Sequence, residues 1–385
     1  MTRSTPRPPT PTPAAPSMVF ALSFALIFAL AAAAALPTTA GAQVGPGKQP
    51  PILTDPAPRA PRVATAATAG SWRLRHTLRG HEGAVYSASF LPGGARVITS
   101  GDDGRVRVWD VRTGGLLRTL EGPGGTISDT AVSPDGRLIA YCTDGGGDPR
   151  IWLIDARTFR TRRSLSGHEE GIFEIVFSPD GRLIASGGRD RVIRLWDVAT
   201  GRLVRKMVGH DDAVTALAFT RDGLRLASAS AERDNTVRVW DVMTGEALHT
   251  LAGHDEWVTS VAFAPDGATL ASGGRDHKLI VWDARAGRKL REQRQPEMVY
   301  EIEFSPDGRV LAEAGGGGRV RIHDARTGRL LSTIRAHTEE INEVKFAPGG
   351  LLLLTASYDA TVKLWEPSPR APKADGKKPP AKWME

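Results

Sequence analysis

The chain has 385 residues, a formal net charge of +7 and a single cysteine, Cys142, so it contains no intramolecular disulfide. No block of lysines or arginines indicates a surface that follows a nucleic-acid backbone, and we expect no nucleic-acid partner. The length allows one large domain with extensions at both ends.

A long apolar segment lies near the N-terminus. It runs from Met18 to Leu36 and follows a basic, proline-rich start. Ala40-Gly41-Ala42 then matches a signal-peptidase site, so residues 1–42 are predicted to be a signal peptide cleaved after Ala42. The segment is also long enough to span a bilayer, and an uncleaved anchor through residues 18–36 is the alternative. Positive charge precedes the segment, so we expect the rest of the chain outside the cytoplasmic membrane, periplasmic or extracellular.

Two further segments lack a periodic apolar pattern. Residues 43–71 are rich in Pro, Ala, Thr and Gly, and we predict a flexible linker. Residues 367–385 are rich in Pro, Lys and Ala, which predicts a disordered basic tail. Trp383 in this tail is interpreted as an isolated exposed side chain, with a docking anchor as the alternative.

Between Trp72 and Glu366 a unit of about 42 residues is repeated seven times. In its fullest form the unit contains Gly-His, Ser-Pro-Asp-Gly, Arg-Asp and Leu-Trp-Asp, in that order. Such a unit is too small to bury its own hydrophobic faces, so neighbouring units must stack on one another. We therefore assign residues 72–366 to one folded domain.

The third unit shows how each repeat folds. Its apolar runs predict four short strands, at 172–177, 183–187, 192–196 and 203–208, separated by turn residues. The first turn, Ser178-Pro179-Asp180-Gly181, combines a proline with fixed φ, an aspartate that caps the turn and a glycine for the left-handed position. Four antiparallel strands per unit predict an all-β fold, a seven-bladed β-propeller.

The Gly-His pair, the Asp of the second turn and the closing Trp-Asp pair resemble the WD40 repeat. The resemblance covers 72–366 and, with the leader, implies a bacterial exported-type WD40 repeat protein. In that family the last blade is completed by an N-terminal strand. The seventh unit ends after its third strand, at Trp365-Glu366, and residues 72–78 have the character of a fourth strand. Deleting 72–79 should therefore destabilise the ring, whereas deleting 43–66 should not.

The resemblance also implies that a His, a Ser or Thr, an Asp and a Trp form a buried hydrogen-bonded tetrad in each complete unit. The set could be mistaken for a hydrolase triad, but five copies at blade spacing, with Thr replacing Ser, indicate a structural role. The five tetrads are His81, Thr99, Asp103 and Trp109; His168, Ser186, Asp190 and Trp196; His210, Ser228, Asp234 and Trp240; His254, Ser272, Asp276 and Trp282; and His337, Thr355, Asp359 and Trp365.

Two units depart from the pattern, and we expect them to lack the tetrad. We interpret the departures as simple sequence drift, and the alternative is that these units are more mobile sectors or sites where a partner inserts. The replacements are Gly122-Pro123, Gly146 and Trp152-Leu153 in the second unit, and Arg294-Gln295, Glu313, Gly317 and His323-Asp324 in the sixth.

We predict no catalytic residue, metal or cofactor. Five of the nine histidines occupy Gly-His positions, and the other four lack ligand-like spacing. No phosphate-binding loop, dinucleotide fingerprint or nucleophile elbow occurs. An enzyme or ligand-binding propeller would need carboxylates or histidines converging on the central channel from several blades, and we find no such set in the sequence.

In WD40 proteins partners usually bind the face where the first strand of each unit begins. We predict a monomeric, non-catalytic protein-interaction scaffold that binds a protein, or an extended acidic or C-terminal peptide, on this face. One alternative is that the aromatic residues only fill the channel rim. Another is a regulatory or sensory module of a membrane-associated signalling system. The corresponding positions are Tyr86, Asp102, Phe173, Arg189, Arg233, Trp257, Arg275, Met298, Tyr300, Asn342 and Tyr358.

Overall fold

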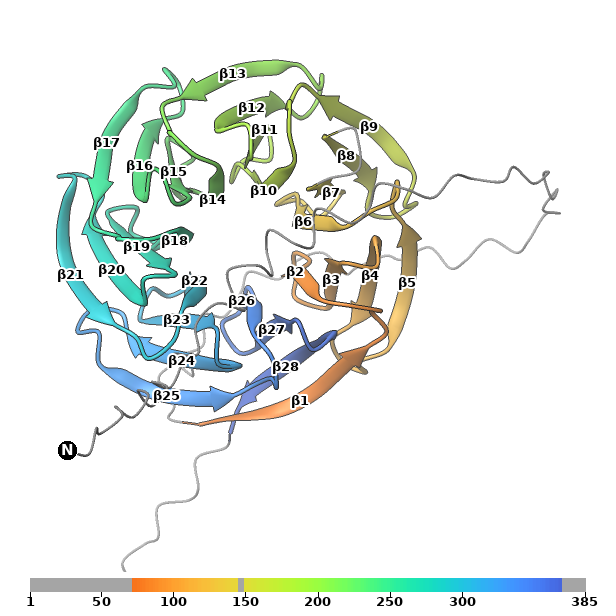
Figure 1. Ribbon diagram of the computed structural model, residues 1–385. Helices are drawn as coiled ribbons and strands as arrows, with labels where there is room; N and C mark the ends of the chain where they lie inside the picture. Colours follow the sequence, from red (N-terminus) through yellow and green to blue (C-terminus); the bar gives the residue numbers. More distant parts are fainter. Residues whose placement is uncertain (1–70, 145–148, 369–385) are drawn as a thin grey trace, which may run out of the picture. The chain divides into compact units, whose positions relative to one another are not determined.

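The computed structural model describes residues 71–144 and 149–368, and every regular element in these ranges is a β-strand (Figure 1). The strands are β1 (Trp72–Arg79), β2 (Val85–Phe90), β3 (Arg96–Gly101), β4 (Arg105–Asp110), β5 (Leu116–Glu121), β6 (Ile127–Val132), β7 (Leu138–Thr143), β8 (Arg150–Asp155), β9 (Thr161–Ser166), β10 (Ile172–Phe177), β11 (Leu183–Gly188), β12 (Val192–Asp197), β13 (Leu203–Val208), β14 (Val214–Phe219), β15 (Arg225–Ser230), β16 (Thr236–Asp241), β17 (Ala247–Ala252), β18 (Val258–Phe263), β19 (Thr269–Gly274), β20 (Lys278–Asp283), β21 (Arg288–Arg294), β22 (Val299–Phe304), β23 (Val310–Gly315), β24 (Arg319–Asp324), β25 (Leu330–Arg335), β26 (Ile341–Phe346), β27 (Leu353–Ser357) and β28 (Thr361–Pro367).

These strands form seven four-stranded antiparallel sheets arranged as the blades of a propeller (Figure 1). Blades 1 to 6 are β2–β5, β6–β9, β10–β13, β14–β17, β18–β21 and β22–β25, and blade 7 is β26–β28 with β1. The predicted all-β, seven-bladed propeller with four-stranded antiparallel blades is confirmed. The seven innermost strands, β2, β6, β10, β14, β18, β22 and β26, surround the central axis of the ring (Figure 1), and we call the region around this axis the channel.

The first and last strands close the ring. β1 pairs antiparallel with β28, in a register that places Leu78 opposite Val362 and Arg73 opposite Glu366. The Leu78 side chain is 2% exposed, and the Arg73 guanidinium lies 2.6 Å from the Glu366 carboxylate. Pairing with β1 removes the open edge that β28 would otherwise present. The predicted closure of the last blade by an N-terminal strand is confirmed.

The hydrophobic core lies between blades. Each of the seven buried clusters combines residues of two neighbouring blades, and one of them joins blades 7 and 1 through Leu78, Val85 and Trp109. Every blade therefore needs both neighbours to bury its two faces, which explains why the units stack into a ring.

The turns define two faces of the ring. At the end of β10, Ser178 Oγ donates a hydrogen bond to Asp180 Oδ1 at 2.6 Å, and Gly181 has φ of 71°. We call this side, where the innermost strands end, the lower face. The opposite side, where the innermost strands begin and the second and third strands of each blade are joined, is the top face.

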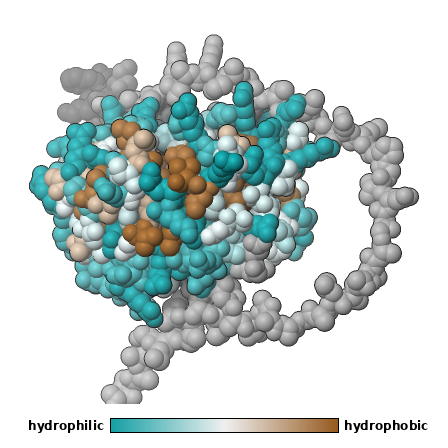
Figure 2. All heavy atoms as spheres, turned by 90° about the horizontal axis from the view of Figure 1, so that it is seen from above, coloured by the Kyte–Doolittle hydropathy of each residue, from teal (hydrophilic) through white to brown (hydrophobic). Residues whose placement is uncertain are grey.

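The outer edge of the ring is mostly hydrophilic. On the side shown in Figure 2, hydrophobic residues gather only in small patches. Many of the exposed large apolar side chains belong to the fourth strands, for example Leu117, Leu203 and Leu330. Scattered residues of this kind are ordinary on a soluble surface and do not mark a binding site.

The predicted signal peptide or anchor (1–42), the predicted linker up to residue 70, and the tail from 369 lie outside the described residues, as does Gly146. Within 71–144 and 149–368 there is no helix that is long and apolar enough to cross a membrane.

Candidate functional site

The structure brings the four side chains of each predicted tetrad together. In blade 3, Trp196 Nε1 donates to Ser186 Oγ at 2.8 Å, Ser186 Oγ lies 2.7 Å from His168 Nε2, and His168 Nδ1 lies 2.9 Å from Asp190. The same three contacts occur in the tetrads that contain His81, His210, His254 and His337.

The electrostatics of the tetrad favour a fixed hydrogen-bond chain over catalysis. Burial lowers the pKa of His168, which favours the neutral imidazole. Burial alone would raise the pKa of Asp190, but the hydrogen bond from His168 and the backbone N–H of Glu169 lower it to about 2. The Ser186 side chain is fully buried, so its hydroxyl meets no substrate.

An arginine pairs with the aspartate of three of the tetrads, which was not predicted from the sequence; one of them is Arg238 on β16, 3.7 Å from Asp234. Arg194 on β12 places Nη1 2.6 Å from Asp190, and Arg107 on β4 lies 2.6 Å from Asp103. All three arginines stand two residues before the tetrad tryptophan, and this spacing is the sequence signal for them. A buried carboxylate is held best when its remaining lone pairs are also used.

The described residues of blade 6 form no His–Ser/Thr–Asp–Trp tetrad, but an ionic network that the sequence did not predict lies in its place. His323 Nε2 lies 2.9 Å from the Glu313 carboxylate, and Arg321 reaches both Glu313 (3.1 Å) and Glu297 (2.6 Å). Arg319 pairs with the other oxygen of Glu297 at 2.6 Å. An ionic network thus replaces the tetrad and satisfies its buried charges pairwise.

The alignment of Trp152 with the tetrad tryptophans is wrong. In blade 2 Leu138 pairs with Asp155, as Leu183 pairs with Asp197 in blade 3. Ile154-Asp155 therefore occupies the Trp-Asp position, and Trp152 lies two residues earlier in the strand. Its indole stacks on Tyr141, with ring centroids 5.3 Å apart and an interplanar angle of 10°. Blade 2 replaces the tetrad with aromatic packing.

Three predicted top-face tyrosines, from blades 1, 6 and 7, lie next to one another. The rings of Tyr86 and Tyr358 meet edge to face, with centroids 5.7 Å apart. The Tyr300 hydroxyl donates to Met298 Sδ at 3.6 Å. Burial and the charge of Glu340 raise the pKa of Tyr300 to about 12, and the same two causes, followed by Tyr300, raise the pKa of Tyr358. We call Tyr86, Asp102, Met298, Tyr300, Glu340 and Tyr358 the tyrosine sector; all six are half-buried or exposed.

Two arginines of the predicted set are held over aromatic rings. In blade 5 the Arg275 guanidinium lies 4.2 Å from the centroid of Trp257. In blade 3 Arg189 lies 5.2 Å from the ring of Phe173 and pairs with Asp144 at 2.9 Å. Cation–π contacts of this kind fix the side chain in place. Burial raises the pKa of the Glu340 carboxyl, and the nearby positive charge of Arg275 opposes this rise, which links blade 5 to the tyrosine sector.

The two remaining predicted residues lie apart from these groups. Asn342 donates from Nδ2 to the backbone oxygen of Val85 at 3.0 Å, which joins blade 7 to blade 1. The hydroxyls of Ser128, Thr215 and Thr259 make the corresponding blade-to-blade bond elsewhere. Asn342 thus has a structural task in the ring. The Arg233 side chain is exposed on the loop of blade 4, and its backbone N–H binds Asp212.

The expectation that no carboxylates converge on the channel is wrong. Lys345 Nζ on β26 lies 2.5 Å from both Glu301 and Glu343, and its charge also acts on Asp129 and Glu174 from blades 2 and 3. Burial raises the pKa of Asp129, Glu174 and Glu343, and the charge of Lys345 opposes this rise.

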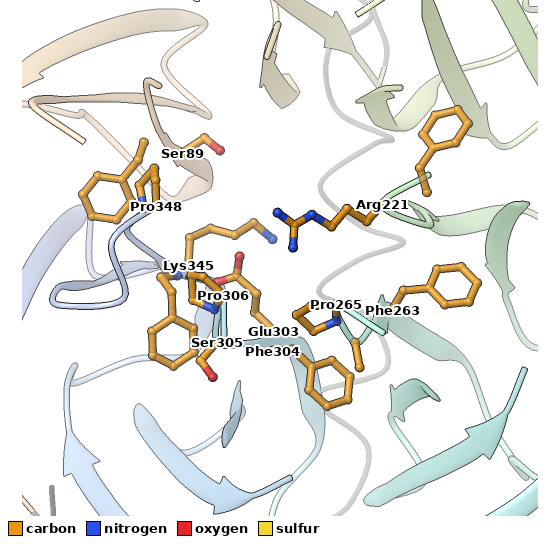
Figure 3. Close-up of a pocket in the computed structure, with 14 residues that line it drawn as sticks. Ser89, Arg221, Phe263, Pro265, Glu303, Phe304, Ser305, Pro306, Lys345 and Pro348 are labelled. Carbon is orange, nitrogen blue, oxygen red and sulfur yellow. Dashed lines mark hydrogen bonds between the residues drawn. The ribbon is translucent and has the colours of Figure 1, made fainter. Parts of the chain in front are cut away.

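Glu303 belongs to the same channel group. Its carboxylate accepts a hydrogen bond from the Phe346 N–H, and burial raises its pKa to about 8 (Figure 3). The signal in the sequence was available: these residues stand at the third and fifth positions of the innermost strands, where other blades have Ala, Ser or Val. Within the described ranges no group of three or more His, Cys, Asp or Glu is arranged to hold a metal.

Comparison with known proteins places these features in a family. The chain is 32% identical over 84 residues to nuclear distribution protein PAC1 of Arthroderma otae, which covers 20% of this chain and 18% of that protein. It is 36% identical over 72 residues to apoptotic protease-activating factor 1 of Homo sapiens, covering 17% and 6%. It is 38% identical over 72 residues to the guanine nucleotide-binding protein subunit beta of Solanum tuberosum, covering 17% and 19%. These alignments span less than a fifth of each relative.

The family model described as WD domain, G-beta repeat matches six segments that together cover more than half of the chain. They leave out 284–327, which contains most of blade 6 and its ionic network. The matched segments are 72–110, 114–153, 159–197, 201–241, 245–283 and 328–366. Each begins with the fourth strand of one blade and continues into the next, which explains why β1 completes blade 7. The chain belongs to the WD40 repeat family.

Proposed function

We propose that this propeller is a non-catalytic scaffold for protein–protein interactions whose partner binds the top face over the tyrosine sector. The observation that carries the proposal is the meeting of Tyr86, Tyr300 and Tyr358 from three consecutive blades, with Trp257 and Arg275 of blade 5 beside them. Aromatic residues and arginines contribute most of the binding energy in protein interfaces.

The arginines on this face are already ordered before a partner arrives. Stacking on Trp257 restricts Arg275, and Phe173 together with Asp144 restricts Arg189. A preorganised side chain loses little rotamer freedom on binding, so more of the contact energy appears as affinity. The fit is to an extended acidic segment or C-terminal peptide that lies across the aromatic residues and pairs with the arginines.

The proposal is tested with the triple variant Tyr86→Ala, Trp257→Ala, Tyr300→Ala. Proteins are captured from the native envelope fraction on immobilised wild-type and variant chains and compared by mass spectrometry. We expect the triple variant to lose a specific partner that the wild type retains, while its melting temperature stays nearly unchanged. Loss of folding in the variant would place these side chains in the core and contradict the proposal.

A matched control removes similar apolar bulk from the outer edge. The triple variant Leu117→Ala, Leu203→Ala, Leu330→Ala truncates side chains that are 42%, 41% and 50% exposed on fourth strands. This variant should capture the same partner as the wild type. Equal losses in both triple variants would show that the top face has no special role.

We further propose that this is a bacterial exported member of the family, with residues 1–42 as a cleaved signal peptide, 43–71 as a linker and 367–385 as a tail. The apolar segment Met18–Leu36 and the Ala40-Gly41-Ala42 site support this proposal. N-terminal sequencing of the protein from its native host decides between release, with Gln43 first, and retention. An intact Met1 would favour a membrane anchor and, with it, a regulatory module of a signalling system.

The propeller is also proposed to act as a monomer, because the closed ring buries both faces of every blade against its two neighbours, so burial of these faces needs no second copy. Sedimentation equilibrium of the purified chain measures this directly. A mass that rises with concentration toward twice the monomer value would contradict it.

A further inference from the structure

The lower end of the channel holds a pocket of about 480 Å³, which no part of the proposed top-face function uses. It is formed where β2, β14, β18, β22 and β26 end and by the turns that follow (Figure 3). Its polar side chains come from Ser89, Arg221, Glu303, Ser305 and Lys345, and the apolar lining residues are five phenylalanines, three prolines and Ala264. The volume is typical of pockets that hold a small ligand or a few peptide residues.

Arg221 is the unusual residue of this pocket. It occupies the second position of the turn after the innermost strand, and the other six blades all have proline there. The turn of blade 4 keeps the common geometry, since Thr220 Oγ1 donates to Asp222 at 2.6 Å and Gly223 has φ of 71°. Proline suits this position because its φ is fixed near the required value. The turn itself therefore does not require an arginine.

The Arg221 guanidinium is directed at the centre of the pocket (Figure 3). Its side chain is exposed, and it forms no hydrogen bond or ion pair with any residue of 71–144 or 149–368. An arginine that replaces proline, points into a pocket and is left without a partner has its five donors available for a ligand.

Two further groups across the pocket have unused hydrogen-bonding capacity. The Ser89 hydroxyl of blade 1 points inward and has no partner among the described residues (Figure 3). Glu303 uses one carboxyl oxygen to accept from the Phe346 N–H. Burial raises the pKa of Glu303 to about 8, which favours a proton on its carboxyl at neutral pH, and no other hydrogen bond of this carboxyl is found within 71–144 and 149–368.

Lys345 also lines the pocket but is already engaged. Its ammonium is paired with Glu301 and Glu343, neither of which lines the pocket, so these ion pairs lie further along the channel. Lys345 therefore has little charge left for a bound anion, and Arg221 is the cation that faces a singly charged carboxylate rather than a doubly charged phosphate. Because these ion pairs lie in the channel beyond the pocket, we expect a bound peptide to end in the pocket and not to pass through the ring.

We propose that this pocket binds the C-terminal carboxylate of a peptide segment of a partner protein. Arg221 pairs with the carboxylate, the Ser89 hydroxyl donates to it, and the apolar wall with Pro265 and Pro306 contacts the last side chain. Guanidinium groups bind carboxylates with two parallel hydrogen bonds, which a single terminal carboxylate satisfies. This inference does not depend on the top-face proposal, since the two sites lie at opposite ends of the innermost strands.

The test uses the full chain and a pool of fluorescein-labelled hexapeptides of Gly and Ser that end in Val, Leu, Met or Phe. Fluorescence anisotropy at low salt compares the free-carboxylate pool, the same pool with amidated C-termini, and an amidated pool with one internal Glu. We expect the free-carboxylate pool to bind with an affinity at least about tenfold higher than that of the other two pools. The two amidated pools cannot form the charge-assisted pair between Arg221 and a terminal carboxylate.

Variants of the same chain identify the residue. Arg221→Gln should weaken binding of the free-carboxylate pool by about tenfold or more and should abolish the difference between free and amidated peptides. Arg221→Pro introduces the residue that the other six turns have, so this variant should keep the fold. It should lose binding of the free-carboxylate pool to the same extent as Arg221→Gln. Arg182→Gln, in the corresponding turn of blade 3 and outside the pocket, is the matched control and should bind like the wild type.

Several outcomes would overturn the proposal. Equal binding of free and amidated peptides would show that no carboxylate is read, and equal binding of the internal-Glu pool would show that a chain end is not required. The proposal would also be overturned if Arg221→Gln bound the free-carboxylate pool with wild-type affinity. It would be overturned as well if no pool bound to the wild type. The top-face triple variant should retain pocket binding, which distinguishes failure of this inference from failure of the proposed scaffold function.

Discussion

Ser186 illustrates what single residues contribute to this fold. Its hydroxyl accepts from Trp196 and contacts His168, so one fully buried oxygen serves two other buried polar groups. Four other blades repeat the arrangement with Ser or Thr at the same position. Buried polar groups are tolerated when they are hydrogen-bonded, and each tetrad meets this condition without water.

Replacing Ser186 with alanine should lower the free energy of unfolding by about 1–3 kcal/mol, because Trp196 Nε1 and His168 Nε2 are left without their partner. Urea denaturation followed by tryptophan fluorescence measures the change. Ser164→Ala, at an exposed position of β9, is the control and should stay within about 0.5 kcal/mol of the wild type. If the Ser186 variant were as stable as this control, the tetrad would make no measurable contribution to the free energy of unfolding.

At the scale of the element, β1 is the strand on which closure depends. It comes first in the chain and completes the last blade, with Leu78 packed into the cluster between blades 7 and 1. Blade 6 shows that a blade can be held together by ion pairs in place of the hydrogen-bonded tetrad. Its ionic network of Glu297, Glu313, Arg321 and His323 occupies the region that a tetrad fills elsewhere.

Two leucines of β1 provide a matched test of this closure. Leu78 is 2% exposed and Leu74 is 48% exposed, although both lie on the same strand. Leu78→Ala should lower the free energy of unfolding by about 2–5 kcal/mol because it leaves a cavity between blades 7 and 1. Leu74→Ala should cost less than about 1 kcal/mol by the same measurement. Similar losses for the two would mean that β1 is not docked as described, and deletion of 72–79 should unfold the ring.

At the scale of the whole molecule, the ring assembles charged residues that are far apart in the sequence. Asp129, Glu174, Glu301 and Glu343 gather around Lys345 only when blades 2, 3, 6 and 7 are all in place. Five carboxyls, including Glu303, share one ammonium group. Burial raises the pKa of Asp129, Glu174, Glu303 and Glu343 above their ordinary values, which makes the stability of the ring depend on pH.

For Glu303 the direction in which stability changes with pH can be worked out and measured. Its pKa rises from an ordinary value of 4.5 to about 8 in the fold, so between these values the folded state holds a proton that the unfolded state lacks. Stability from this group is complete below pH 4.5, falls by at most about 1.4 kcal/mol per pH unit as pH rises, and is lost above pH 8.

The variant Glu303→Gln stays neutral and should escape this loss, so its stability relative to the wild type should increase from about pH 5 to about pH 9. Thermal unfolding over this range measures the difference. Glu169→Gln, at an exposed position, should follow the wild type. A constant difference between Glu303→Gln and the wild type across the range would show that Glu303 is ionised in the folded protein.

The repeat period and the turn residues determined the architecture from the sequence alone. Blade number, strand number and closure by β1 were predictable because each follows from a local pattern that recurs at fixed spacing. Where a local pattern was weak, prediction failed. Trp152 was assigned to the wrong position because the second turn of blade 2 is longer, and the register is set by pairing of Leu138 with Asp155.

The tertiary structure decided which side chains meet across blades. The contacts of Tyr86 with Tyr358, of Asn342 with Val85 and of Lys345 with Glu301 join different blades, and no spacing within one repeat reveals them. The same holds for the channel carboxylates and the pocket that contains Arg221. The sequence by itself determined the repeated blade, because that depends on neighbours in the chain. Only the closed ring determined the contacts within the tyrosine sector, the channel carboxylates and the lower pocket, because these depend on how distant repeats pack.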